Sequence, residues 1–208
     1  MHYKKLSYKH YIVLIILALA LIIASIDPLE YASYALHQIG TALMLIFLFY
    51  VQKKYGLSYR AFTLYIGFLL IHILGAHYLY SYVPYNEWSI EYLSFDLNHY
   101  MNWDRNMYDR LVHFAYGLLL YPIFYRLIQI HLSQLSQIAL LLIVVQFVMA
   151  TSLIYEWIEW LIAINLSPEA AENYNGQQGD IWDAHKDMLL ATIGAIVTGL
   201  IMFKRDKK

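Results

Sequence analysis

Cysteine is absent from this 208-residue sequence, and charged residues make up only 14% of it. Without cysteine the chain can form neither a disulfide bond nor a thiolate metal site, and nothing indicates the redox state of its compartment. The scarcity of charge excludes an ordinary soluble domain, which needs far more polar surface at this length. Repeats, low-complexity runs and signs of a second domain are also lacking. We therefore expect one integral membrane domain over residues 1–208.

Hydrophobic residues make up 61% of the chain and come in blocks, which is typical of helices that face lipid. The 21 Tyr and five Trp suit the interface between lipid and water. The sequence predicts an all-α, polytopic bundle of six transmembrane helices, with spans at about 11–26, 34–51, 61–80, 110–127, 138–164 and 188–203. The first apolar segment lacks a convincing cleavage pattern after Ala24, so we interpret it as a span and not as a signal peptide.

Basic residues predict the orientation, because Lys and Arg concentrate on the cytoplasmic side of membrane proteins. Of the 14 basic residues, all but Arg105, Arg110 and Lys186 fall on one side of the predicted spans. The residues on that side are Lys4, Lys5, Lys9, Lys53, Lys54, Arg60, Arg126, Lys204, Arg205, Lys207 and Lys208. This bias predicts a multi-pass membrane protein with both termini in the cytoplasm.

Two loops on the opposite side are long enough to carry structure. In the 81–108 loop, apolar residues recur at roughly helical spacing, which predicts a short interfacial helix on the outer leaflet or a lid over the bundle. The sequence leaves these two alternatives open. The second long loop contains Ser167-Pro168-Glu169, a helix-start pattern.

Ionisable residues gather at the outer ends of the last three predicted spans. On helices, Asp109 and His113 share one face, and Glu156 and Glu159 share another. Asp180, Asp183 and Asp187 would form a third acidic stripe if that stretch is helical. All three groups lie at similar depth, since the fourth and sixth spans enter from the side where the fifth one leaves. The candidate polar site comprises Asp109, His113, Glu156, Glu159, Asp183 and Asp187.

Such residues are costly in a membrane, at about 2.5–3.5 kcal/mol or more each at the centre of a helix. Two glutamates one turn apart also repel each other, so a proton or a cation must compensate them. The candidate cations are Arg110, His113, His77 and a bound divalent metal such as Mg²⁺, Mn²⁺, Fe²⁺ or Zn²⁺. The candidate metal ligands are His113, Glu156, Glu159 and Asp187. The competing interpretation is structural, with the aspartates as helix caps and the rest as a network that holds the helices together.

The histidines outside this set are weaker signals. We expect His37, His72 and His77 to hydrogen-bond neighbouring helices, and His2, His10, His99 and His131 to lie in loops or at interfaces.

The inner halves of the spans contain no acidic residue or histidine, which is unlike the path of a proton-coupled transporter. The pattern favours an outward-facing site that binds or acts on a lipid-borne polar group. Its chemistry would be that of a hydrolase or transferase if it is an enzyme. The alternative is a non-catalytic envelope protein or transporter that uses the same residues structurally. The expected partners are the bilayer and a lipid-linked small molecule, with no nucleic acid, and the oligomeric state is not predicted.

Four motifs in this order resemble the YjdF-type family of bacterial inner-membrane proteins. They are Gly75-Ala76-His77-Tyr78-Leu79-Tyr80-Ser81-Tyr82-Val83-Pro84, Tyr108-Asp109-Arg110-Leu111-Val112-His113-Phe114, Tyr155-Glu156-Trp157-Ile158-Glu159-Trp160 and Gln178-Gly179-Asp180-Ile181-Trp182-Asp183-Ala184-His185-Lys186-Asp187-Met188. The resemblance covers the whole chain and implies a location in the bacterial inner membrane, but it supplies no reaction and no catalytic residue. It does draw attention to His77.

A more remote resemblance joins Asp109, His113-Phe114 and Asp187 to the VanZ-type membrane family, whose members are linked to glycopeptide-antibiotic resistance. VanZ-like proteins tend to have Asn four residues after the last Asp, where this chain has Ala191. This departure puts any shared chemistry in doubt.

Overall fold

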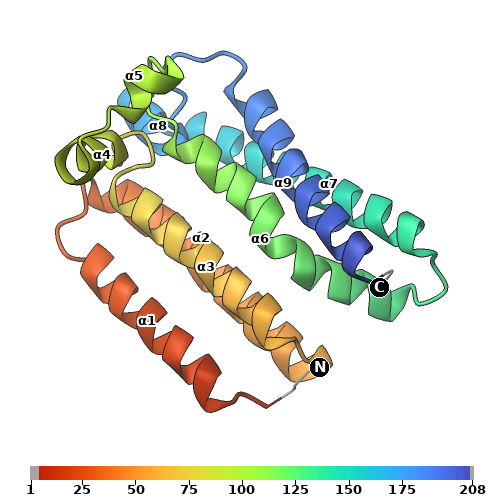
Figure 1. Ribbon diagram of the computed structural model, residues 1–208. Helices are drawn as coiled ribbons and strands as arrows, with labels where there is room; N and C mark the ends of the chain where they lie inside the picture. The colour runs from red at the N-terminus through yellow and green to blue at the C-terminus, as the bar shows by residue number, and fades with distance from the viewer. Residues whose placement is uncertain (1–4, 207–208) are drawn as a thin grey trace.

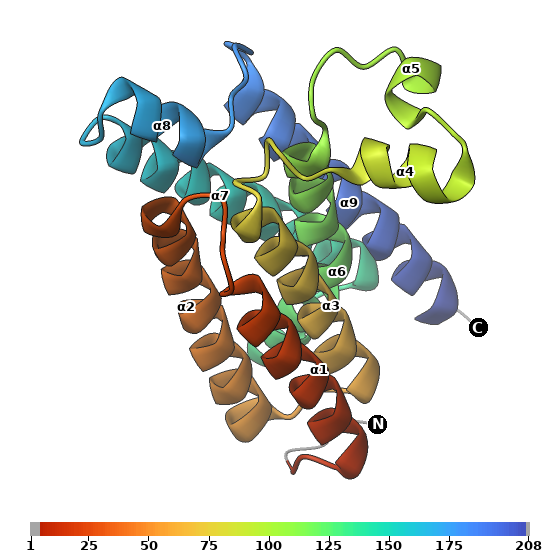
Figure 2. The same ribbon diagram turned by 90° about the vertical axis from the view of Figure 1, so that its left-hand side faces the viewer.

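The regular elements are all α-helices in the computed structural model, which describes residues 5–206 (Figures 1 and 2). In chain order they are α1 (Tyr8–Ala24), α2 (Tyr31–Tyr55), α3 (Tyr59–His77), α4 (Tyr85–Leu93), α5 (Leu97–Met101), α6 (Tyr108–His131), α7 (Gln137–Ala163), α8 (Pro168–Asn175) and α9 (Asp183–Asp206). The predicted all-α membrane bundle is confirmed.

The six long helices coincide with the six predicted spans. Within residues 5–206, α2, α3, α6, α7 and α9 are long and apolar enough to cross a membrane. The 17-residue α1 is a shorter apolar helix, about 25 Å long at about 1.5 Å per residue. The total of six spans therefore stays a prediction that depends on α1.

Two sequence expectations change in detail. The third predicted span reaches residue 80, but α3 ends at His77 because Leu79 and Tyr80 adopt left-handed backbone angles, with φ of 52° and 56°. Asp180 precedes α9, which begins at Asp183, so the condition for a three-residue acidic stripe is not met and only Asp183 and Asp187 share a helix. Three basic residues used for the orientation, Lys4, Lys207 and Lys208, lie outside the described residues, as does His2.

Helices α3 and α6 form the centre of the bundle. Helices α1 and α2 pack on α3, while α7 and α9 pack on α6 and on each other. The connecting helices α4, α5 and α8 lie together at one end, opposite the start of α1 and the end of α9 (Figure 1). We call this the acidic end, because it carries the beginnings of α6 and α9 with Asp109 and Asp183. The opposite end, with Lys53, Lys54 and Arg60, is the basic end.

Large apolar side chains cover the outside of the bundle. On α1, for example, Ile15, Ile22 and Ile23 are exposed, at 59%, 61% and 68%. A continuous apolar surface of this kind would be unfavourable in water and suits contact with lipid tails.

Each long connection at the acidic end carries helix, as the sequence predicts. The 81–108 loop holds two short helices, α4 and α5, instead of one. Helix α8 begins with Ser167 as its N-cap, whose hydroxyl accepts a hydrogen bond from Ala170 N at 3.3 Å. The ring of Tyr174 in α8 stacks on that of His37 in α2, with 4.8 Å between the ring centres, so α8 bridges α7 and α2 at this end.

Helices α6 and α9 run parallel and touch through glycines. A Cβ atom on Gly117 would lie 1.8 Å from the carbonyl oxygen of Ala191, and one on Gly194 would lie 2.2 Å from that of Phe114. Any larger residue would therefore push the two helices apart. One helical turn toward the acidic end from Gly117 and Ala191 are His113 and Asp187, which this close approach brings face to face.

Candidate functional site

A buried carboxylate cluster lies between α6, α7 and α9 near the acidic end. The first turns of α6 supply Asp109 and His113, and the last turns of α7 supply Glu156 and Glu159. The first turns of α9 add Asp187. We use the name carboxylate cluster for these five residues.

His113 lies between two acids from different helices. Its Nε2 atom is 3.7 Å from Oδ1 of Asp109, and its Nδ1 atom is 3.7 Å from Oε1 of Glu156. Both separations exceed hydrogen-bond distance, so the imidazole faces the two carboxylates without bonding either one. One turn beyond Glu156, the carboxyl group of Glu159 is close enough for its charge to interact with those of Glu156 and Asp109.

Asp109, His113 and Asp187 present a ligand set for a metal ion. Each residue offers one ligand atom, and these atoms all lie within 4.8 Å of one another. The three side chains are buried, and Asp187 is only 2% exposed. Two ligands of one zinc ion, each at about 2.0–2.2 Å, are at most about 4.4 Å apart, so modest side-chain movements would bring all three onto one ion.

Two carboxylate oxygens of the cluster lack a hydrogen-bond partner among the described residues. They are Oδ1 of Asp187 and Oε1 of Glu156, and both atoms are buried. A buried acceptor without a partner costs free energy, and far more if it is charged. Glu156 Oε1 is the atom that lies 3.7 Å from His113 Nδ1, and Asp187 belongs to the ligand set with the same histidine, so the residues present fit a bound cation.

A separate ionic network closes the site on the side of the connecting loops. Arg105 Nη1 donates to Asp183 Oδ1 at 2.7 Å, and Arg110 pairs with both Asp180 and Asp183. Lys186 Nζ donates to Asp180 Oδ2 at 2.6 Å. The hydrogen bond from Lys186, followed by those from the backbone of Trp182 and from Arg110, holds the pKa of Asp180 well below its usual range. We call Arg105, Arg110, Asp180, Asp183 and Lys186 the arginine–aspartate network.

The predicted site residues thus fall into two groups. The structure brings Asp109, His113, Glu156 and Asp187 together, with Glu159 one turn away along α7. Asp183 instead belongs to the arginine–aspartate network. Of the four predicted metal ligands, His113 and Asp187 lie in the ligand set, where the third member is Asp109 and neither Glu156 nor Glu159.

Two of the three side chains that we expected to compensate the glutamates, Arg110 and His77, contact other groups instead. Arg110 pairs with Asp180 and Asp183 and not with the glutamates of α7. His77 Nδ1 donates to the carbonyl oxygen of Ala24 at 2.9 Å, so it joins α3 to the end of α1. His113 is therefore the candidate that lies beside Glu156, at the distance given above.

Sequence reasoning missed a buried tyrosine–histidine pair, formed by His72 of α3 and Tyr80 in the turn that follows this helix. The phenol oxygen of Tyr80 lies 2.6 Å from Nδ1 of His72. His72 Nε2 lies 3.3 Å from the carbonyl oxygen of His37, which can only accept, so Nε2 carries the proton and Tyr80 donates to Nδ1. Burial also raises the pKa of Tyr80 far above its usual value, which keeps the phenol protonated.

The tyrosine–histidine pair adjoins the carboxylate cluster. The Tyr108 hydroxyl donates to the carbonyl oxygen of Ile71 at 3.0 Å, which sets Asp109 on α6 level with His72 on α3. The ring of Tyr80 folds back onto Gly75, where a Cβ atom would lie 2.6 Å from the ring. The first family motif contains both Gly75 and Tyr80, and this was the one hint of the contact in the sequence. Residue spacing alone, however, does not reveal a turn that brings a side chain back onto its own helix.

Comparisons with known proteins place the chain among membrane proteins. A family model described as "Predicted membrane protein (DUF2238)" matches residues 9–208. The chain is similar to "Inner membrane protein YjdF" of Escherichia coli (strain K12), with 26% identity over 186 residues that cover 89% of this chain and 85% of that protein. No solved structure matches the chain. These matches do not show the more remote VanZ-type resemblance, which stays a prediction.

Proposed function

The chain belongs to the DUF2238 family of predicted membrane proteins, and we propose that its carboxylate cluster holds a divalent metal ion and binds or acts on a polar group carried by a lipid. The observation that carries this proposal is the convergence of Asp109, His113 and Asp187 within 4.8 Å inside a bundle that faces lipid. The similar Escherichia coli protein is an inner-membrane protein, and we place this chain there too, with both termini in the cytoplasm and the acidic end outward.

The ligand types support an ion that accepts both imidazole and carboxylate. Mn²⁺, Fe²⁺ and Zn²⁺ meet this requirement, whereas Ca²⁺ and Mg²⁺ prefer oxygen ligands alone. Asp109, His113 and Asp187 would hold the ion, and Glu156 would accept a proton or complete the coordination. When bound, the ion would polarise an oxygen of the substrate, for example one of a phosphate ester.

A groove of about 540 Å³ between α7 and α9 supports a lipid-borne substrate. Its lining includes Ala150 and Leu153 of α7, along with Met188 and Leu189 of α9. Glu156 follows Leu153 by three residues on α7, and Asp187 directly precedes Met188 on α9, so the groove lies within one helical turn of the cluster on both helices. An acyl chain in the groove would bring a polar headgroup to the carboxylates without leaving the membrane.

Metal analysis of the purified full chain tests the first part of the proposal. After incubation with Mn²⁺ or Zn²⁺ and removal of the excess, we expect about one ion per chain, and its loss in His113→Ala and Glu156→Ala variants. His77→Ala and Glu169→Ala are the matched controls, because these residues lie outside the cluster. A wild-type protein that retains no ion, or a His113→Ala variant that retains it fully, would contradict the proposal.

Binding of a short-chain phosphatidic acid tests the second part. In the metal-loaded protein, we expect this lipid to raise the unfolding temperature more than the matching diacylglycerol does. The difference should disappear in Ala150→Trp, which fills the groove, and should persist in Ala42→Trp, which adds the same side chain on the exposed face of α2. An equal rise in unfolding temperature with the two lipids would contradict the proposal that the site binds a lipid phosphate.

Of the six candidate site residues, Asp183 is the one for which an observation favours the alternative, in which the residue only stabilises the fold. Its carboxylate is held by Arg105 and Arg110, which join the loop before α6 to the start of α9. The arginine–aspartate network therefore stabilises the fold around the carboxylate cluster, whereas the cluster itself has no arginine or lysine ion pair among the described residues.

A further inference from the structure

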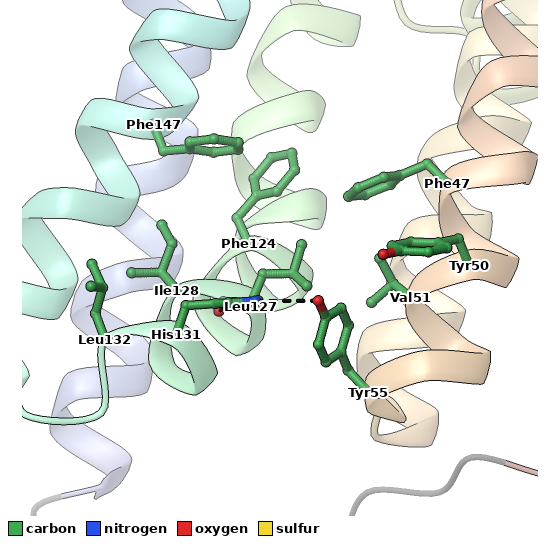
Figure 3. Close-up of a pocket in the computed structure, with 10 residues that line it drawn as sticks. All are labelled: Phe47, Tyr50, Val51, Tyr55, Phe124, Leu127, Ile128, His131, Leu132 and Phe147. Carbon is green, nitrogen blue, oxygen red and sulfur yellow. Dashed lines mark hydrogen bonds between the residues drawn. The ribbon is translucent and has the colours of Figure 1, made fainter.

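A second hollow lies at the basic end, far from the carboxylate cluster. It has a volume of about 260 Å³ and lies between α2 on one side and α6 and α7 on the other (Figure 3). Aromatic rings dominate its walls: Phe47 and Tyr50 of α2 face Phe124 of α6 and Phe147 of α7 across the gap. We call it the basal pocket.

The basal pocket exists because α2 packs against α3, which leaves a gap between α2 and the pair formed by α6 and α7. At the acidic end, α8 fills the space between α2 and α7 through the Tyr174–His37 stack. Nothing among residues 5–206 plays that part at the basic end, so the walls of the pocket stay apart. Phe47 is partly exposed and Phe147 is 40% exposed, which leaves the pocket accessible from the lipid.

The rim of the basal pocket is positively charged and polar. Lys54 Nζ donates to the Tyr50 hydroxyl at 2.8 Å and lies 5.2 Å from the ring centres of Tyr50 and Tyr55. The Tyr55 hydroxyl is 3.2 Å from His131 Nε2, which closes the floor between α2 and α6 (Figure 3). Within the described part of the chain, Lys54 has no ion pair with a carboxylate.

Acidic side chains are missing from the segments that build this pocket. The sequence has no Asp or Glu between Glu30 and Glu87, or between Asp109 and Glu156. The α2, α6 and α7 segments at the basic end therefore present positive charge that no neighbouring carboxylate of the same segments neutralises. A negatively charged group at the membrane surface is the complementary partner.

We propose that the basal pocket binds an anionic phospholipid, with one acyl chain among the aromatic rings and the phosphate at Lys54, Tyr55 and His131. The site is independent of the carboxylate cluster. Lipid tails are apolar already, so moving one from the bilayer into the pocket yields little hydrophobic gain. Selectivity must come from the headgroup, and one lysine near the surface favours an anionic lipid roughly fivefold.

Native mass spectrometry of the purified full chain tests this site. From micelles with equal amounts of phosphatidylglycerol and phosphatidylcholine, we expect the wild-type protein to retain phosphatidylglycerol roughly fivefold more. Lys54→Gln should bring the ratio near one. The adjacent Lys53→Gln is the matched control, because Lys53, unlike Lys54, makes no hydrogen bond to a tyrosine of the pocket among the described residues, and it should keep most of the preference.

A pocket-filling variant tests the position of the acyl chain. Leu127→Trp should remove both lipids from the retained fraction, whereas Ile46→Trp on the exposed face of α2 should not. Should Leu127→Trp fail to fold, Leu132→Trp fills the same pocket from a residue that is 48% exposed. Equal behaviour of Lys54→Gln and Lys53→Gln, full retention in the filled variants, or a lipid-free dimer in place of the lipid adduct would each overturn the proposal.

Discussion

At the scale of single residues, two aspartates one turn apart on α9 have opposite electrostatic surroundings. Asp183 receives a hydrogen bond from Arg105 at 2.7 Å, whereas Asp187 Oδ1 is buried with no partner among the described residues. The same chemical change at the two positions should therefore have effects of opposite sign.

We expect Asp187→Asn to stabilise the metal-free protein by about 1 kcal/mol, because it removes a buried carboxylate that has no arginine or lysine ion pair among the described residues. Asp183→Asn should destabilise it by roughly 1.5–3 kcal/mol, since the hydrogen bonds from the arginines to a charged acceptor are lost. Unfolding temperatures in detergent measure both effects, and Asp187→Asn should also abolish metal binding. A similar loss of stability in both variants would show that Asp187 is part of the structural network.

At the scale of elements, the contact of α6 with α9 positions the candidate ligands. Gly117 and Gly194 allow backbone to meet backbone, and His113 and Asp187 lie one turn away from that contact. The sequence contains both glycines, but their spacing gives no sign of which helices they join, because apolar residues occur on every face of these helices.

Gly117→Ala should lower stability by about 1–3 kcal/mol and weaken metal binding, because the added methyl group meets the Ala191 carbonyl and separates the two helices. Gly67→Ala is the matched control, since a Cβ atom there meets nothing within 4 Å. This control should be neutral or stabilise α3 by about 0.5–1 kcal/mol, as alanine favours helix. Thermal unfolding and metal titration compare the two variants, and an equal response would contradict the importance of the α6–α9 contact.

At the scale of the whole molecule, the six long helices must alternate across the membrane if both ends of the chain lie on one side. Helix α1 decides the matter, because it is the one whose 17 residues fall near the lower limit for a span. Its two ends, near Lys9 and Asp27, should then face opposite sides.

The absence of cysteine makes this prediction simple to test. In intact cells, a membrane-impermeant maleimide should label Asp27→Cys and Glu91→Cys at the acidic end, but not Lys9→Cys or Lys53→Cys at the basic end. Lysis should expose all four sites. Labelling of Lys9→Cys and Asp27→Cys from the same side would reduce the spans to five.

The sequence by itself determined the membrane class, the extents of the long helices to within several residues and the end of the bundle that carries the ionisable groups. It could do so because hydropathy and helical spacing are properties of short segments. Only the tertiary structure decided that Asp183 pairs with Arg105 while Asp187 faces His113, that Tyr80 returns to His72, and that a pocket opens beside α2. These outcomes depend on how each helix is rotated and how closely it approaches its neighbours, which helices with apolar residues on every face do not encode in their local pattern.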